Sequence, residues 1–147
     1  MPSVKDFFTA EQVKQVESAI RAAEESTSGE IRVHLEKGCL SDPVPCAAAM
    51  FKKLKMHKTK LGNGILFYLA VQDRKFAVIG DAGIHKCVPA GFWDLVRDKM
   101  LVLFKEEKFT EGLCEGITMT GIELKKYFPL SASDKNELSN EVTFGEK

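Results

Sequence analysis

The segment spanning residues 63–83, NGILFYLAVQDRKFAVIGDAG, constrains the fold of this chain more than any other. Residues 65–71 form an uninterrupted apolar run, which is typical of a strand buried on both faces. A second apolar run, residues 76–79, follows after only a short polar break, and so short a connection predicts an antiparallel hairpin. The sequence therefore predicts two strands at the centre of a sheet that needs cover on both faces.

The preceding chain supplies helices and one further strand. Thr9 and Gln12 fit a capping box, and apolar residues at helical spacing follow them. Residues 30–36 alternate apolar and polar side chains, which predicts a strand with one face buried and the other wet or only lightly covered. His34 lies on that second face, where we expect a solvated residue and not a ligand. Residues 38–45 are expected to form a loop, and a short helix follows around Phe51.

The order of these elements predicts the fold class. A helix separates the strand at residues 30–36 from the run at 65–71, which implies a parallel crossover. Two amphipathic helices are expected after residue 89, the first ending near residue 107 and the second closed by Pro129. We predict an α/β fold with a mixed sheet and helices on both faces, as one domain over residues 1–129. The polar residues 130–147 are expected to form a flexible tail, with docking of Val142 and Phe144 as an alternative.

Charge and hydropathy narrow the function classes. Lys plus Arg and Asp plus Glu number 21 each, so no global field favours a nucleic acid or an anionic membrane. The longest apolar run is far shorter than the roughly 20 residues that a membrane helix needs. The amino terminus has no basic segment followed by an apolar core. We therefore expect no nucleic-acid partner, no membrane span, no signal peptide and a cytoplasmic location.

The four cysteines and three histidines show no zinc-binding pattern, since no two cysteines form a CxxC pair. Reduced, partly buried thiols are the expectation. Cys39 and Cys46 lie in one loop region, and under oxidising conditions they could form a disulfide.

No catalytic motif is recognisable, and carboxylates at strand ends are the remaining candidates for a site. Glu30 opens the first strand, Asp73 closes the second, and Asp81 closes the third. Calcium and magnesium take oxygen ligands of this kind. The antiparallel hairpin places Asp81 near Glu30, whereas Asp73 lies at the opposite edge, where parallel strands end and ligands usually bind. Alternatively, Asp73 is only a turn residue and Asp81 only caps a turn.

Several short motifs, in this order and spacing, resemble the TPM domain family over roughly residues 7–129. The motifs are a Phe-Thr pair opening the first helix, SGEI at 28–31, NGIL at 63–66, DRK at 73–75, GDAGI at 80–84, and Phe109 with Gly112-Leu113. The resemblance implies a Rossmann-like α/β/α sandwich, binding of divalent cations, calcium especially, and weak acid phosphatase activity. Glu30, Asp73 and Asp81 match the family's recurrent polar positions.

Two departures from the family pattern bear on what the resemblance implies. Family members usually carry a signal peptide and a membrane anchor, and neither is visible here. The acidic residue that often opens the helix after the third strand is replaced by the sequence PAG at residues 89–91, which weakens the transfer of a phosphatase site.

Three functional hypotheses follow. The first is a small non-catalytic domain that binds calcium or magnesium and a protein partner. The alternative is a metal-dependent acid phosphatase acting on phosphomonoesters, in which the basic residues at 52–60 attract the substrate. The third is a purely protein-binding scaffold.

Overall fold

A computed structural model describes residues 4–59, 61–130 and 140–145. Its strands form one mixed sheet in the order β3-β2-β1-β4. The helical elements are η1 (Val4–Asp6), α1 (Ala10–Glu24), α2 (Pro43–Lys53), η2 (Met56–Lys58), α3 (Ala82–His85), α4 (Phe92–Lys105) and α5 (Phe109–Tyr127). The strands are β1 (Glu30–Glu36), β2 (Gly64–Ala70), β3 (Lys75–Gly80) and β4 (Thr143–Phe144).

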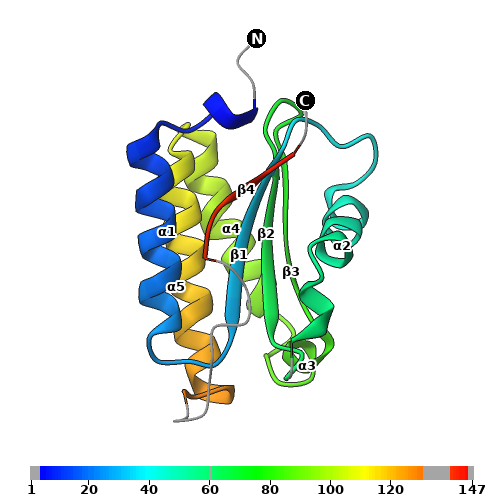
Figure 1. Cartoon of the computed structure of the whole chain (residues 1–147), viewed down its shortest axis with the longest axis vertical. Helices are drawn as coiled ribbons and strands as arrows, with labels where there is room; N and C mark the ends of the chain where they lie inside the picture. The colour runs from blue at the N-terminus through cyan, green and yellow to red at the C-terminus, as the bar shows by residue number, and fades with distance from the viewer. Residues whose placement is uncertain (1–3, 60, 131–139, 146–147) are drawn as a thin grey trace.

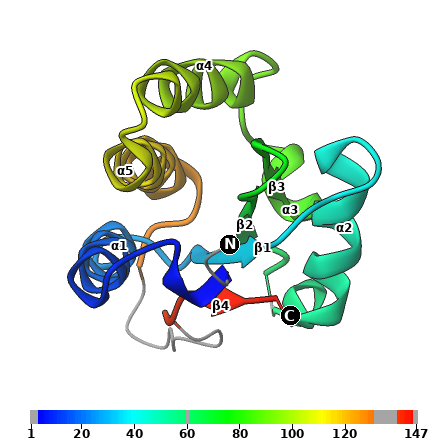
Figure 2. The ribbon, with the colours of Figure 1, turned by 90° about the horizontal axis from the view of Figure 1, so that it is seen from above.

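The chain folds into three layers, as predicted. Helices α1, α4 and α5 cover one face of the sheet and α2 covers the other (Figures 1 and 2). Strand β2 pairs parallel with β1 and antiparallel with β3. The parallel crossover and the hairpin expected from the sequence are therefore both confirmed, and the fold is an α/β/α sandwich.

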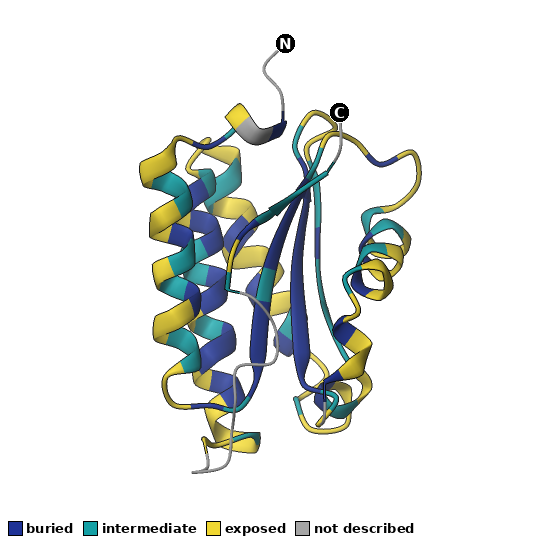
Figure 3. Ribbon diagram, in the orientation of Figure 1, coloured by how far each residue is buried: buried dark blue, intermediate teal, exposed yellow. Residues whose placement is uncertain are grey.

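The central strand β2 explains why its sequence does not alternate. All seven of its residues are buried (Figure 3). Ile65, Phe67 and Leu69 pack into the core beneath α1, α4 and α5. Leu66 and Tyr68 pack into a second core beneath α2. Because successive strand residues point to opposite faces, a strand between two helical layers must be apolar at every position.

The helical layer is held together by close backbone contacts. Gly121 of α5 faces α1, and a Cβ added there would lie 2.7 Å from the Cβ of Ala23. Gly116 faces the core, where an added Cβ would lie 2.6 Å from the sulfur of Met100. Real Cβ atoms do not approach so closely, so glycine at these positions sets the spacing of α1, α5 and α4. The capping box of Thr9 and Gln12 at the start of α1 is also confirmed.

The structure corrects the sequence interpretation around α2. This helix begins at Pro43, within the segment predicted to be a loop, and it has proline at its first position. Proline suits that position because the first helical N–H groups have no partner within the helix, and because its fixed φ fits a helix. Turn signals and helix-start signals share Asp and Pro, so the sequence did not distinguish them.

The polar face of β1 is not wet. His34 is 3 % exposed, contrary to the sequence prediction, because β4 pairs with β1 beside it and Tyr68 stacks against its ring. Val142 is also buried, so this part of the tail docks on the sheet. Residues 131–139, 146 and 147 lie outside the described residues, and flexibility of the tail as a whole stays a prediction.

Cys39 and Cys46 form a disulfide, so the expectation of reduced thiols is wrong for this pair, whereas Cys87 and Cys114 are free.

Among the described helices, none combines the length and apolar character needed to cross a bilayer.

Candidate functional site at the carboxyl edge of the sheet

The predicted carboxylates lie at two opposite edges of the sheet. Asp81 follows β3, and its N–H donates to the carbonyl of Gly64 at the start of β2 (2.9 Å). Glu30 lies at the same edge, where its N–H donates to the backbone carbonyl of Asn63 (3.1 Å). Asp73 belongs to the β2–β3 turn at the other edge. The structure thus brings Glu30 and Asp81 to one edge and separates both from Asp73, as the antiparallel hairpin requires.

The edge of the sheet at which β1 and β2 end is the carboxyl edge, and the edge at which they begin is the amino edge. At the carboxyl edge, backbone hydrogen bonds connect the β2–β3 turn to the end of β1. The N–H groups of Val71 and Gln72 donate to the backbone carbonyls of Glu36 and Lys37, at 2.9 and 3.0 Å respectively. Arg74 closes the turn with a φ of 53°, in the left-handed region. These bonds extend the sheet past the ends of its strands and hold the turn beside the segment that follows β1.

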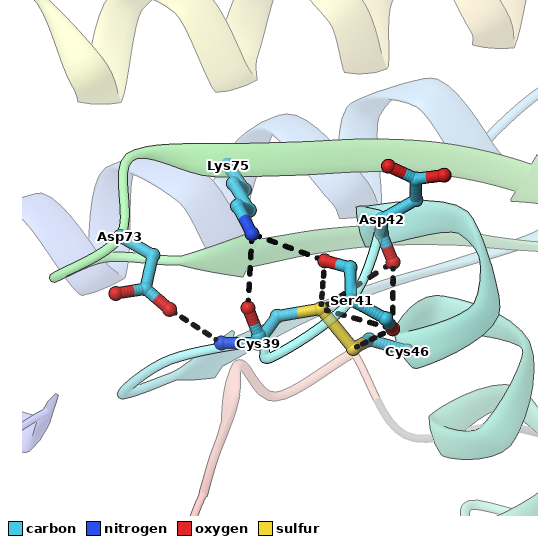
Figure 4. The surroundings of a disulfide bond; sticks show 6 residues. All are labelled: Cys39, Ser41, Asp42, Cys46, Asp73 and Lys75. Carbon is cyan, nitrogen blue, oxygen red and sulfur yellow. Dashed lines mark hydrogen bonds between the residues drawn. A yellow bond between two sulfur atoms is a disulfide. The ribbon is translucent and has the colours of Figure 1, made fainter.

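Asp73 binds this segment directly. Its Oδ2 accepts a hydrogen bond from the N–H of Cys39 (2.7 Å). A Cβ on Gly38 would lie 2.8 Å from the same oxygen, so the close approach depends on glycine. The disulfide of Cys39 to Cys46 then fixes the segment to α2 (Figure 4). Asp73 is therefore a positioned carboxylate and not merely a solvated turn residue.

Lys75 lies on the other side of the same segment. Its ammonium donates to the carbonyls of Cys39 and Ser41, each at 3.1 Å, and Figure 4 shows it directed at both oxygens. Two carbonyl oxygens and the nearby Asp73 carboxylate thus form an oxygen-rich surface that already holds one cationic group.

A second carboxylate increases the negative charge of this edge. Glu36 accepts a hydrogen bond from His34 (3.0 Å), whose other ring nitrogen lies 2.7 Å from the hydroxyl of Thr143. Burial lowers the pKa of His34, opposed by its bond to Glu36. The pKa of Tyr68 is raised by burial and then by the charges of Glu36 and Asp73. The negative charges of Glu36 and Asp73 are therefore both felt on the side of the sheet that α2 covers.

The amino edge has a different character. Asp81 caps α3, with its Oδ1 accepting from the N–H of Ala82 (2.7 Å). Glu30 is 3 % exposed, and Glu24 at the end of α1 lies close to it. Glu24 accepts from the N–H of Ile31 (2.8 Å), and burial raises its pKa to about 7, opposed by that bond and assisted by the charge of Glu30. The sequence did not identify Glu24, because one acid in the last turn of an amphipathic helix carries no signal of burial.

The three predicted acids do not fit a single metal site. Within the residues that the structure describes, no group of three or more His, Cys, Asp or Glu side chains is placed to hold an ion. Asp73 and the carbonyls of Cys39 and Ser41 supply oxygen donors of the type that calcium and magnesium accept, although Lys75 occupies both carbonyls. A donor set with one carboxylate suits an ion that keeps most of its water.

Comparisons with known proteins identify relatives of the whole chain. The family model of the TPM domain matches residues 4–122. No curated protein matches the chain. The solved structure of the BA42 protein from the psychrophilic bacterium Bizionia argentinensis is 46 % identical, covers 99 % of this chain and 100 % of its own, and superposes with a TM-score of 0.90.

Two more distant structures share the fold alone. The N-terminal domain of the cg2496 protein from Corynebacterium glutamicum is 13 % identical, with a TM-score of 0.66, and covers 93 % of this chain and 83 % of its own. The N-terminal domain of a protein from P. gingivalis is 20 % identical, with a TM-score of 0.68, and covers 82 % and 78 %.

Proposed function

The chain belongs to the TPM domain family, and from this premise we propose that it is a non-catalytic domain whose carboxyl edge binds a divalent cation through Asp73. The observation that carries the proposal is the position of Lys75. Its ammonium bonds to two backbone carbonyls beside the Asp73 carboxylate. These oxygens favour positive charge, and a divalent ion interacts with them more strongly than an ammonium does.

The donor set predicts weak binding with little preference between ions. Asp73 supplies the single carboxylate, and one of its oxygens already accepts from Cys39. An ion would retain several water molecules, as magnesium does when one or two carboxylates hold it. We expect dissociation constants on the order of 1 mM, as in low-affinity extracellular calcium modules. The charge of Glu36, which like that of Asp73 raises the pKa of Tyr68, would assist the binding.

Lys75 makes the proposal testable in both directions. Asp73→Asn removes the carboxylate and should weaken calcium and magnesium binding by at least tenfold. Lys75→Gln removes the competing ammonium and frees two carbonyls, so it should strengthen binding severalfold. Arg74→Gln is the matched control, because it removes one positive charge from the same turn without freeing a carbonyl. Backbone amide shifts in 15N-HSQC spectra, followed during calcium and magnesium titrations, measure all three.

The result that would overturn the proposal is equal affinity in the wild type and Asp73→Asn. Asp81→Asn should leave the affinity unchanged, because Asp81 lies at the other edge of the sheet. If Asp81→Asn abolishes binding and Asp73→Asn does not, the ion binds at the amino edge and the proposal is wrong.

The phosphatase alternative has a separate readout. Lys52 and Lys53 lie in the last turn of α2, at the opposite end of that helix from its first residue, Pro43, so these two of the basic residues predicted to attract a substrate do not adjoin Asp73. Hydrolysis of p-nitrophenyl phosphate that needs a divalent cation and disappears in Asp73→Asn would favour the phosphatase over the non-catalytic domain. Hydrolysis that survives this substitution and chelation would indicate a contaminating enzyme.

A further inference from the structure

The other side of the β2–β3 turn holds an apolar cavity. The α2 side of this edge is acidic and polar, whereas the opposite side opens between the turn and the ends of α4 and α5. The cavity there has a volume of about 150 Å³. Its walls come from the end of β2, the β2–β3 turn, the start of β3, α4, the start of α5 and the segment before α1.

The walls of the cavity are aromatic. Phe7, Phe76 and Phe104 line it together with Phe109. The ring centroids of Phe76 and Phe104 lie 4.8 Å apart, and those of Phe7 and Phe109 lie 5.2 Å apart, both in edge-to-face geometry. An apolar cavity of about 150 Å³ takes one benzene-sized group. The walls therefore suit a single aromatic ring.

The mouth of the cavity is positively charged. Lys105 is exposed at the end of α4, and its ammonium has no polar partner among the described residues. Arg74 also lines the cavity, and the ion pair that it forms within the described part of the chain is an exposed one with Glu107 at 3.7 Å. Lys75 lines the cavity as well, but its ammonium bonds to two backbone carbonyls on the α2 side, so two cations remain at the mouth and one carboxylate pairs with them. Phe109 is the first residue of α5, but Glu111 in the same turn offsets the positive end of this helix, so the attraction for an anion comes from the two cationic side chains.

We propose that this cavity binds a small aromatic carboxylate, with the ring packed against the wall of phenylalanines and the carboxylate beside Lys105 and Arg74. The cavity excludes an ion alone, because its walls are apolar. A neutral ring would fill it but would leave the charge at the mouth unmatched. The ligand class is thus one ring joined by a short linker to one carboxylate, for which phenylacetate is the simplest probe.

Three small probes test the contribution of the ring and that of the carboxylate separately. We expect phenylacetate to give saturable shifts of cavity amides with a dissociation constant on the order of 1 mM, which suits a ligand of this size. Phenylacetamide has the same ring without the charge and should bind about 2- to 5-fold more weakly, as expected for losing an exposed charge pair. Acetate, which has no ring, should give no saturable shifts. All titrations contain EDTA, so that a metal does not contribute.

Two substitutions on α4, each with a control on the same helix, test the location. Leu101→Trp places a ring at the cavity mouth and should weaken phenylacetate at least tenfold, whereas Leu95→Trp lies outside the cavity and should not. Lys105→Gln should weaken phenylacetate 2- to 5-fold without affecting phenylacetamide, and Lys99→Gln should affect neither. Both pairs of positions are exposed, so the variants should fold, which HSQC spectra verify.

The proposal is overturned if phenylacetate causes no saturable shifts up to 20-fold the expected constant of roughly 1 mM. It is also overturned if Leu101→Trp and Leu95→Trp bind phenylacetate equally, because the ligand then lies elsewhere. Equal binding of phenylacetate and phenylacetamide would refute the role of the charged mouth.

Discussion

Replacing Glu24 with glutamine should stabilise the fold at pH 8 and leave it nearly unchanged near pH 4.5. Burial raises the pKa of Glu24 from 4.5 to about 7. Between these two values the folded protein keeps a proton that the unfolded chain has released, so stability falls as the pH rises. The contribution of the protonated form is complete below pH 4.5 and lost as the pH passes 7.

The magnitude follows from the two pKa values. At about 1.4 kcal/mol per pH unit, the rise from 4.5 to about 7 corresponds to about 3 kcal/mol. Glu24 is only partly buried, and solvent screens its charge, so we expect on the order of 1–2 kcal/mol. Glutamine carries no charge beside Glu30, and its side-chain oxygen can still accept from the N–H of Ile31, which now bonds to Glu24 at 2.8 Å.

Urea unfolding followed by the fluorescence of Trp93 between pH 4.5 and 8.5 measures the effect. The difference between the variant and the wild type is the relevant quantity, because His34 acts in the opposite direction. Its lowered pKa means that its contribution to stability is lost as the pH falls. Glu25→Gln, one residue away and exposed, is the matched control and should show no pH-dependent difference. A Glu24→Gln difference that is the same at pH 4.5 and pH 8 would refute the reasoning.

Two further predictions concern the disulfide and the α1–α5 contact. Joint replacement of Cys39 and Cys46 by serine opens a covalent loop with a sequence separation of 7 and should lower the free energy of unfolding by about 2.5 kcal/mol. Reducing agent should cause a similar loss in the wild type, and equal stability of the double variant and the oxidised wild type would contradict this expectation. Gly121→Ala should cost about 1–2 kcal/mol, because its Cβ would lie 2.7 Å from that of Ala23. Gly91→Ala, where no atom lies within 4 Å of the added Cβ, should be close to neutral in the same urea experiment.

The sequence predicted most of the fold because a strand that is buried on both faces is apolar at every position, which is visible in the sequence. An apolar run without alternation requires helices on both sides, and a short polar break requires an antiparallel turn. The placement of Asp73 opposite Asp81 follows from that turn. Binding of calcium or magnesium, a protein partner and a cytoplasmic location stay predictions.

The sequence could not reveal contacts between segments far apart in the chain. The face of β1 that carries His34 alternates as a wet face does, yet β4, more than 100 residues later, pairs beside β1 and brings Thr143 against His34. Glu24 has the position of a surface acid, and only the folded structure shows that it is partly buried, bonded to Ile31 and close to the charge of Glu30. The pairing of Cys39 with Cys46 was open in the sequence for the same reason.

By itself, the sequence determined the layers, the strand directions and the edge at which each acid lies, because periodicity and connection length are local properties of the chain. Only the tertiary structure decided what surrounds those acids. It placed Lys75 on the carbonyls beside Asp73, and it joined four separate phenylalanines into one cavity under Lys105. Such environments arise from packing between elements, and no local pattern of residue types encodes which side chains meet there.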